Sequence, residues 1–389
     1  MAEVLLVDAG FSAVPLYRRL RAMGLNVHTV GARAEDALAR MNSRHWLLDY
    51  SDTEALARRV DAAGIDYLVP GCTDVSYASC VALNRDGRFP GVETAANIDR
   101  LHDKKAFRQM GRELGLSMPK VLDETQPAHF PVIVKPVDAF SGQGITVVEA
   151  GEDFEPACQR ARGLSRSGRI VVEEFVRGQL HSHSVFLSQQ RVVADFLVEE
   201  HCVAEPWKVD LSHAHALISD ALRARLRAEV EILAGALGLC DGLLHLQFIC
   251  DNERFWWIEP ARRCPGDLYS QLIELSYGPG YVDGYLAGFL GSAPAADTVK
   301  PPLPVLRHTL SCPAGEAFEG LECRPPAPLR RFVPLMEPGQ AAGEQPRRAG
   351  IGFYEFESHE VLMQTVAQAR QGQGLATAPV DSHEDPNPA

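Results

Sequence analysis

Two oxygen-bearing side chains are spaced so that they can hold a cation. Residues 242–263, GLLHLQFICDNERFWWIEPARR, form two apolar runs on either side of Asp251-Asn252 and predict a β-hairpin. Gln247 and Glu259 fall on its two arms, so both side chains can face one ion. Mg²⁺ takes oxygen ligands, usually one or two from protein and the rest from phosphates and water. The hairpin therefore predicts a sparse magnesium site of the kind that nucleotide chemistry needs.

A lysine followed by a glycine loop precedes this hairpin. KPVDAFSGQG, residues 135–144, comes directly after the apolar run FPVIV. On its own the loop fits an ordinary hairpin as well as a phosphate cradle, although its glycines allow the φ > 0 conformations of an anion nest. Asp103-Lys104 opens a predicted helix before it, and VVEEFVRG, residues 171–178, follows it. The ordered set favours phosphate binding.

Charged residues after the hairpin suggest what the substrate carries. Arg262 and Arg263 can clamp a carboxylate or a phosphate, and Asp267 can bind an amino group. Cys264, beside Arg263, is interpreted as a small packing residue. From charge alone, this set fits an amino acid or a similar small carboxylate.

The first hundred residues must supply the scaffold on one side of the site. Strand-like runs such as VLLVDAG and DYLVPG alternate with helical patterns such as TEALARRVDAAG. This alternation predicts a doubly wound parallel α/β domain. Ligands of such sheets bind beyond the carboxyl ends of the strands, here near 8–12 and 71–74.

The middle of the chain mixes antiparallel strands and helices, which predicts an α+β region. FPVIVKPVDAFSGQGITVVEAG reads as strand, glycine loop and strand, and residues 220–239 form a long amphipathic helix. Residues 292–305 are rich in proline and predict a linker, and a small β-rich segment follows. The last residues are polar and proline-rich, which predicts a disordered tail.

With these motifs in place, the chain resembles the ATP-grasp superfamily of carboxylate–amine ligases along nearly its whole length. The resemblance implies an ATP-grasp fold, α/β plus α+β, in five parts. These are an N-terminal α/β domain at 1–100, a linker helix and ATP lid at 101–185, a catalytic subdomain at 186–295, a C-terminal β-rich domain at 296–375 and a tail at 376–389.

The resemblance also implies roles for individual residues. Lys104 and Lys135 would bind the nucleotide phosphates, and Ser141, Gly142, Gln143 and Gly144 would form the lid loop over them. Glu173, Glu174, Phe175 and Val176 would form the adenine hinge, chiefly through backbone groups, with His181 near the ribose. Gln247 and Glu259 would hold Mg²⁺, or Mn²⁺ in its place, and Arg263 would neutralise charge on the transferring phosphoryl group. Trp207 and Lys208 would contact the acceptor substrate.

Two departures from the family pattern leave alternatives open. The metal motif usually carries asparagine two residues after the glutamate, and this chain has Ala261. The acidic ribose ligand that often follows the hinge glycine is also missing, and Gln179, Leu180 and His181 stand there. The alternatives are a bicarbonate-activating enzyme of the carboxylase or carbamoyl-phosphate type and a catalytically silent ATP-binding module. The function favoured is amide formation through an acyl phosphate with release of ADP.

Composition limits the remaining classes. A net charge of −13 over 389 residues argues against nucleic-acid binding, which needs a basic surface. Nine scattered cysteines without metal spacing fit reduced thiols in a cytoplasmic protein, and no run is long enough to span a membrane. The His181/His183 and His213/His215 pairs are interpreted as surface residues rather than a zinc site. The expected partners are small-molecule carboxylates and amines, with a homodimer allowed.

Overall fold

The computed structural model describes residues 1–139, 142–214, 218–251, 253–295, 301–323, 328–371 and 376–377. The chain divides into two compact units. The first comprises residues 1–199 and 216–301, and the second comprises residues 200–215 and 302–389. The sequence placed residues 200–215 in the catalytic subdomain, whereas in the structure they belong to the second unit.

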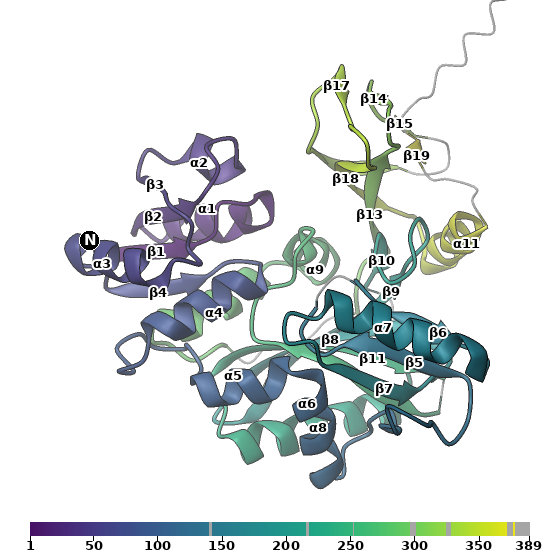
Figure 1. Cartoon of the computed structure of the whole chain (residues 1–389). Coiled ribbons are helices and arrows are strands. Elements are labelled where there is room, and N and C mark those ends of the chain that lie inside the picture. Colours follow the sequence, from purple (N-terminus) through teal and green to yellow (C-terminus); the bar gives the residue numbers. More distant parts are fainter. Residues whose placement is uncertain are drawn as a thin grey trace, which may run out of the picture. The chain divides into compact units, whose positions relative to one another are not determined.

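The N-terminal part of the first unit is a parallel sheet with helices, shown in purple and blue in Figure 1. Its strands are β1 (Glu3–Val7), β2 (Asn26–Gly31), β3 (His45–Leu47) and β4 (Tyr67–Pro70), in the order β3-β2-β1-β4. The connecting helices are η1 (Phe11–Ala13), α1 (Val14–Ala22), α2 (Ala37–Met41), α3 (Thr53–Ala63) and α4 (Asp74–Leu83). All strand pairings are parallel, as the alternating pattern predicted. Asp52 and Thr73 cap α3 and α4 by accepting backbone hydrogen bonds.

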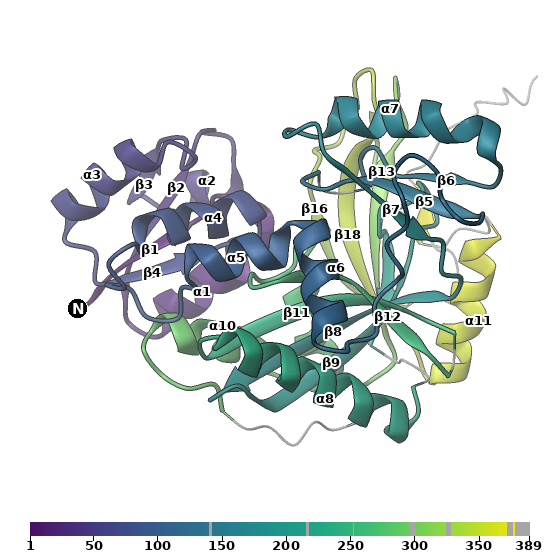
Figure 2. The same cartoon turned by 60° about the horizontal axis from the view of Figure 1, so that its bottom comes forward.

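Helices α5 (Ala95–His102) and α6 (Lys104–Glu113) lead to a small antiparallel sheet. Strands β5 (Val132–Pro136), β6 (Thr146–Val148) and β7 (Ile170–Glu174) lie in the order β6-β5-β7. Helix α7 (Phe154–Leu164), which follows η2 (Gly151–Asp153), covers this sheet (Figure 2). Apolar side chains of α7, including Phe154 and Ala157, pack against Val132 and Val134. This layer, at the position predicted for the ATP lid, is called the lid below.

The rest of the first unit is a larger antiparallel sheet with helices. Strands β8 (Gln179–Ser188), β9 (Arg191–His201), β11 (Gly242–Cys250) and β12 (Phe255–Ala261) follow the order β12-β11-β8-β9. Helices α8 (Asp220–Leu237), α9 (Tyr269–Tyr277) and α10 (Tyr281–Phe289) accompany them. Phe255 and Trp257 of the hairpin are buried, and Trp256 between them is half-buried.

The second unit is β-rich with one long helix. Strands β10 (Leu211–His213), β13 (Val305–Cys312), β18 (Arg347–Glu355) and β16 (Leu329–Pro334) are neighbours in that order. Two short pairs join β14 (Ala317–Phe318) to β17 (Gln340–Ala341) and β15 (Glu322–Cys323) to β19 (Ala376–Thr377). Helix α11 (His359–Arg370) packs its buried Leu362 and Val366 with Leu306 and Tyr354. Residues 376–377, predicted as the start of a disordered tail, form a strand, and 378–389 lie outside the described residues.

Across the described parts of the chain, no helix is long and apolar enough to cross a membrane. The eight cysteines whose side chains are described are all free thiols.

Candidate active site

The predicted cation ligands are direct neighbours across the hairpin of β11 and β12. Gln247 and Glu259 are cross-strand partners, with an irregularity in the pairing immediately after Gln247. Glu259 is exposed, and Gln247 is half-buried. An exposed carboxylate beside an amide is a hard oxygen donor set that fits Mg²⁺. Ala261 pairs with His245 further along the hairpin, and its methyl group offers no third ligand.

Arg263 is held beside this hairpin by Asp74, the first residue of helix α4. Its Nε and Nη2 atoms bind the two carboxylate oxygens of Asp74 at 2.7 and 2.9 Å, a bidentate pair. Burial alone would raise the pKa of Asp74, but Arg263 outweighs it and holds this pKa below its ordinary value. Arg263 also interacts electrostatically with Glu259. The pair thus places residues 71–74, which follow β4, beside the hairpin that carries Gln247 and Glu259.

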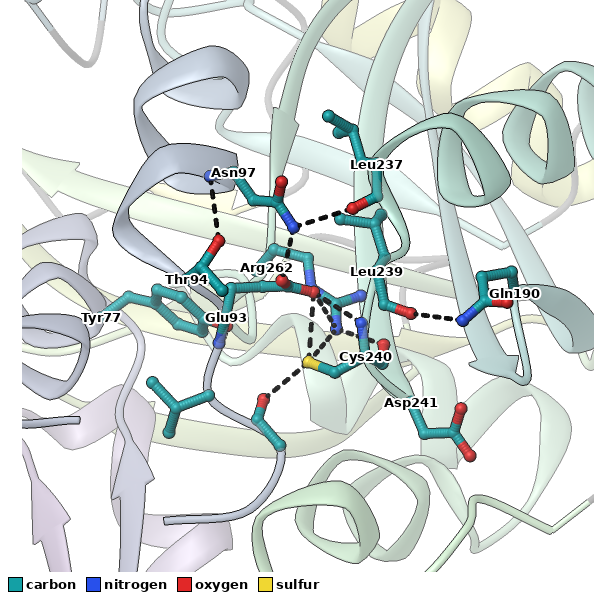
Figure 3. Close-up of polar contacts among 12 residues, drawn as sticks. Tyr77, Glu93, Thr94, Asn97, Gln190, Leu237, Leu239, Cys240, Asp241 and Arg262 are labelled. Atoms are coloured by element: carbon teal, nitrogen blue, oxygen red, sulfur yellow. Dashed lines mark hydrogen bonds and ion pairs between the residues drawn. The ribbon is translucent and has the colours of Figure 1, made fainter. Parts of the chain in front are cut away.

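Arg262 is engaged elsewhere, which corrects its prediction as a substrate clamp. Figure 3 shows its guanidinium facing Glu93 and Cys240. Its Nη2 donates to the Cys240 carbonyl at 2.8 Å and lies 3.3 Å from Glu93 Oε1. Glu93 also accepts from the Cys240 amide at 2.9 Å, and its own amide donates to the Tyr77 hydroxyl at 3.3 Å. Arg262 is 2% exposed. It faces away from Arg263 because the side chains of consecutive residues in an extended segment point in opposite directions.

The two predicted phosphate-binding lysines are both near the glycine loop. Lys104 is the first residue of α6, and its Nζ donates to the Ala139 carbonyl at 2.8 Å. Lys135 is buried in β5, with its Nζ 2.7 Å from Glu173 Oε2. The two lysines interact electrostatically, and the Lys104 charge helps to lower the pKa of Lys135 below its ordinary value, although burial is the larger cause. Two interacting positive charges, only one of which has a carboxylate partner in this group, favour the binding of an anion.

The loop between β5 and β6 has the backbone conformation expected of an anion nest. Gly142 and Gly144 have φ values of 74° and 73°, in the left-handed region that favours glycine. A Cβ atom on Gly144 would also lie 2.8 Å from Pro136 Cγ. Gln143 between them is exposed, and Ser141 lies outside the described residues.

The predicted adenine hinge is the end of β7 and the turn into β8. The Glu174 amide donates to the Lys120 carbonyl at 2.9 Å, and the Phe175 amide donates to the Pro131 carbonyl at 3.2 Å. The Glu174 carboxylate accepts from the Lys120 amide at 3.0 Å. The backbone amides of Glu174 and Phe175 are therefore already hydrogen-bonded to neighbouring segments, and Val176 follows in the turn.

The histidines are buried, contrary to the surface positions predicted for them. His181 stacks on Phe248, with ring centroids 5.1 Å apart, and its Nδ1 lies 3.0 Å from the Gln179 carbonyl. Burial lowers the pKa of His181 to about 4, so the ring is neutral at pH 7. His183 and His213 are fully buried, and His215 lies outside the described residues.

The remaining predicted substrate residues belong to different units of the chain. Asp267 lies in the turn between β12 and α9 with a φ of 52°. Trp207 and Lys208 belong to the second unit. Trp207 is 40% exposed with a φ of 66°, and Lys208 pairs with Glu205.

Comparison with known proteins gives a family for the central part of the chain. Residues 128–270, which contain the lid, the hinge and the cation hairpin, match the model of the ATP-grasp domain. The chain carries an ATP-grasp domain. The ATP-grasp domain predicted from the ordered motifs is therefore confirmed for these residues.

Relatives of known name cover part of the chain. A formate-dependent phosphoribosylglycinamide formyltransferase of Stutzerimonas stutzeri is 29% identical over 186 residues, which is 45% of this chain and 47% of that protein. A protein of the same name from Burkholderia pseudomallei is 28% identical over 187 residues, 45% of this chain and 46% of its own. The chain thus spans about half the length of the curated relatives it matches.

Solved structures share the fold over nearly the whole chain. An L-amino acid ligase of Bacillus licheniformis aligns with a TM-score of 0.77 at 16% identity, covering 97% of this chain and 98% of that one. A phosphoribosylglycinamide synthetase of Anaerococcus prevotii aligns with a TM-score of 0.75 at 14% identity, with the same coverage. These alignments confirm the predicted ATP-grasp fold.

Sequence reasoning missed two residues that bind the predicted ones. Asp74 was noted only as part of an edge, although an acidic residue at a helix start after a strand end is a recognisable position. Arg108, which binds Glu173, stands four residues after Lys104 in α6, and no role beyond the helix predicted to open at Asp103-Lys104 was expected for it. Its spacing on the same helix face was the available signal.

Proposed function

We propose that the chain is an ATP-dependent ligase that joins a small carboxylate to an amine through an acyl phosphate, releasing ADP and phosphate. The observation that carries this proposal is the pairing of Gln247 with Glu259 beside Arg263, together with Lys104 and Lys135 near the glycine loop. The names of the relatives support carbon–nitrogen bond formation.

The chain's own residues act mainly by position and charge. Lys104, Lys135 and the backbone of the Gly142–Gly144 loop would hold the nucleotide phosphates, and residues 173–176 with His181 would hold the nucleoside. Arg263, fixed by Asp74, would stabilise charge on the phosphoryl group during transfer. Closure of the lid would exclude water from the acyl phosphate.

Gln247 and Glu259 would hold Mg²⁺, and Mn²⁺ has the same preference for oxygen ligands. When bound, the ion supplies positive charge to the phosphate oxygens. Glu259 provides the negative charge of this donor set, and Gln247 provides a neutral oxygen.

The reaction has two balanced steps. A carboxylate oxygen of the substrate attacks the γ-phosphorus, and the bond from that phosphorus to the β,γ-bridging oxygen breaks, so ADP leaves. The amine nitrogen then attacks the acyl carbon, the bond from this carbon to the phosphate oxygen breaks, and the nitrogen loses a proton to solvent. Neither step needs a covalent nucleophile from the protein.

The substrate proposed is an amino acid or a similar small carboxylate, and the nitrogen donor is an amine. Arg263 is the carboxylate-binding candidate now that Arg262 is engaged with Glu93, and Asp267, Trp207 and Lys208 remain candidates for substrate contact. The fold shared with a biotin carboxylase of Campylobacter jejuni, at a TM-score of 0.72, keeps bicarbonate activation as the second candidate. Cytoplasmic location and a homodimer remain predictions.

The test is release of ADP from Mg-ATP in the presence of amino acids, formate or bicarbonate, each with and without an amine. We expect release to require one carboxylate and to rise with an amine. Lys135→Ala should abolish turnover and weaken ATP binding, whereas Arg160→Ala, at an exposed position of α7, should change neither. Release with bicarbonate alone would favour the second candidate, and ATP binding without any release would favour a silent module.

A further inference from the structure

We propose that Arg108 and the side chain of Glu173 are positioning residues that hold Lys135 toward the nucleotide phosphates and tie the lid to the metal-binding strand. This inference rests on the proposed function, because it concerns the same nucleotide site. It assigns a role to an arginine that no motif in the sequence had marked.

The geometry is a buried triad with one carboxylate between two cations. Glu173 Oε1 lies 2.7 Å from Arg108 Nε, and Glu173 Oε2 lies 2.7 Å from Lys135 Nζ. The side chains of Arg108 and Glu173 are 0% exposed and that of Lys135 is 6% exposed. The Arg108 contact is an ion pair whose N–H direction lies outside hydrogen-bond geometry. Glu173 pairs with Ile133 across β5 and β7, which places it diagonally from Lys135 on the same face.

The charges of the triad do not balance. Two cations and one carboxylate leave one positive charge in a region that water does not reach. Burial raises the pKa of Glu173, but Arg108 and Lys135 outweigh it and hold that pKa at about 2. Burial pushes the pKa of Lys135 below its ordinary value, and the Arg108 charge adds to this effect. Arg108 Nη1 is also buried and has no hydrogen-bond partner among the described residues. An anion near Lys135 would offset the excess charge.

The same arginine reaches the metal-binding strand. Arg108 Nη2 donates to the Ile258 carbonyl at 2.8 Å, and Ile258 directly precedes Glu259. Lys104, one helical turn earlier in α6, contacts the glycine loop through Ala139. One helix therefore contacts the glycine loop, the carboxylate that holds Lys135, and the strand that carries Glu259. The planar guanidinium of Arg108 contacts both Glu173 and the Ile258 carbonyl at once, which a lysine ammonium group cannot do.

The experiment measures binding of Mg-ATP to the full chain by displacement of a fluorescent ADP, as a function of Mg²⁺ concentration. Arg108→Met should weaken Mg-ATP binding at least tenfold and raise the Mg²⁺ concentration for half-maximal binding. Arg108→Lys keeps the positive charge but loses the planar guanidinium that contacts both partners. It should therefore weaken Mg-ATP binding less than Arg108→Met does, and it should still raise the Mg²⁺ concentration for half-maximal binding. Arg112→Met, the same change at an exposed position of α6, is the matched control and should bind like the wild type. If Arg108 only stabilised the fold, Arg108→Met would lower the unfolding temperature and leave the Mg²⁺ dependence of binding unchanged.

Two results would overturn the inference. One is a folded Arg108→Met variant whose affinity and Mg²⁺ dependence lie within twofold of the wild type. Should that variant fail to fold, Arg108→Lys with wild-type affinity and Mg²⁺ dependence has the same meaning. The double change Arg108→Met with Glu173→Gln keeps the net charge of the triad, and we expect it to fold but to bind Mg-ATP weakly. Wild-type protein that binds no Mg-ATP would instead refute the proposed function, which keeps the two failures distinct.

Discussion

Glu173 in the lid and Asp195 in β9 are both buried carboxylates between cations, but their surroundings differ. Glu173 has Arg108 and Lys135, both almost fully buried. Asp195, itself 1% exposed, binds Arg223 Nε at 2.9 Å and Arg227 Nη1 at 2.6 Å. These two arginines come from α8 and are 35% and 38% exposed, so water screens their charges. His183 adds a third contact to Asp195 at 3.0 Å.

The difference indicates what each cluster does. Around Asp195 the excess positive charge is shared with solvent, and Arg227 Nη2 also donates to the Val192 carbonyl at 3.0 Å. Around Glu173 the excess positive charge is buried, and we interpret it as part of a site for an anionic ligand. The same arrangement of charges thus anchors a helix in one place and prepares an anion site in the other. The predictions below test this distinction or the effect of burial on which it rests.

The largest effect is expected from Asp195→Asn. Loss of the carboxylate leaves His183 without its charged partner and removes the anchor of α8, so we expect the free energy of unfolding to fall by about 3 kcal/mol. Urea denaturation measures the loss. Mg-ATP affinity should stay within twofold of the wild type, and a large loss of affinity would mean that the two clusters are not functionally distinct.

Acid should next destabilise the protein through two buried histidines that lie outside both clusters. Burial lowers the pKa of His181 and of His308 to about 4, against 6.5 in the unfolded chain. Between pH 6.5 and 4 the unfolded chain binds these protons and the folded protein does not, so stability falls as the pH falls. Each histidine should cost about 2 kcal/mol at pH 5, from about 1.36 kcal/mol per pKa unit. The Glu173 triad should keep its charges in this range because the Glu173 pKa is about 2.

Denaturation in urea from pH 7 to 5 tests this, with His308→Gln as the informative variant. Its stability should depend less steeply on pH than that of the wild type. If the free energy of unfolding of this variant depends on pH as steeply as that of the wild type, His308 is not a buried neutral group in solution.

A smaller effect is expected from Gly144→Ala in the lid loop, compared with Gly168→Ala. Both glycines have positive φ values, 73° and 69°, so alanine should cost about 1 kcal/mol at either position. Only at Gly144 would the new Cβ press on Pro136, since nothing lies within 4 Å at Gly168. We expect Gly144→Ala to destabilise by about 2 kcal/mol and to weaken Mg-ATP binding. Equal effects at the two positions would remove the argument for a shaped anion nest.

The smallest effect is expected from Glu124→Gln, which breaks an ion pair with Lys105 on the surface. The two side chains are 31% and 51% exposed, and the atoms are 2.7 Å apart. Screening by water limits such a pair to about 0.5 kcal/mol. A loss above 1 kcal/mol in urea denaturation would show that burial is a poor guide to the strength of these charge clusters.

The sequence alone determined the family, the parallel N-terminal sheet and the hairpin that pairs Gln247 with Glu259. These features are local, because strand periodicity, glycine turns and residue spacing follow from neighbouring residues. The positive φ values of Gly142 and Gly144 were expected for the same reason.

Only the tertiary structure decided how the charged residues are paired. Arg262 and Arg263 are adjacent and chemically identical, yet one binds Glu93 and the other binds Asp74, 189 residues away. His181 and His183, predicted on the surface, are buried in β8, which lies inside its sheet between β11 and β9. Arg108 meets Glu173 because α6 crosses from the lid to β12. Charge pairing depends on which distant segments meet and how much water they exclude, and neither is written in the local pattern of the chain.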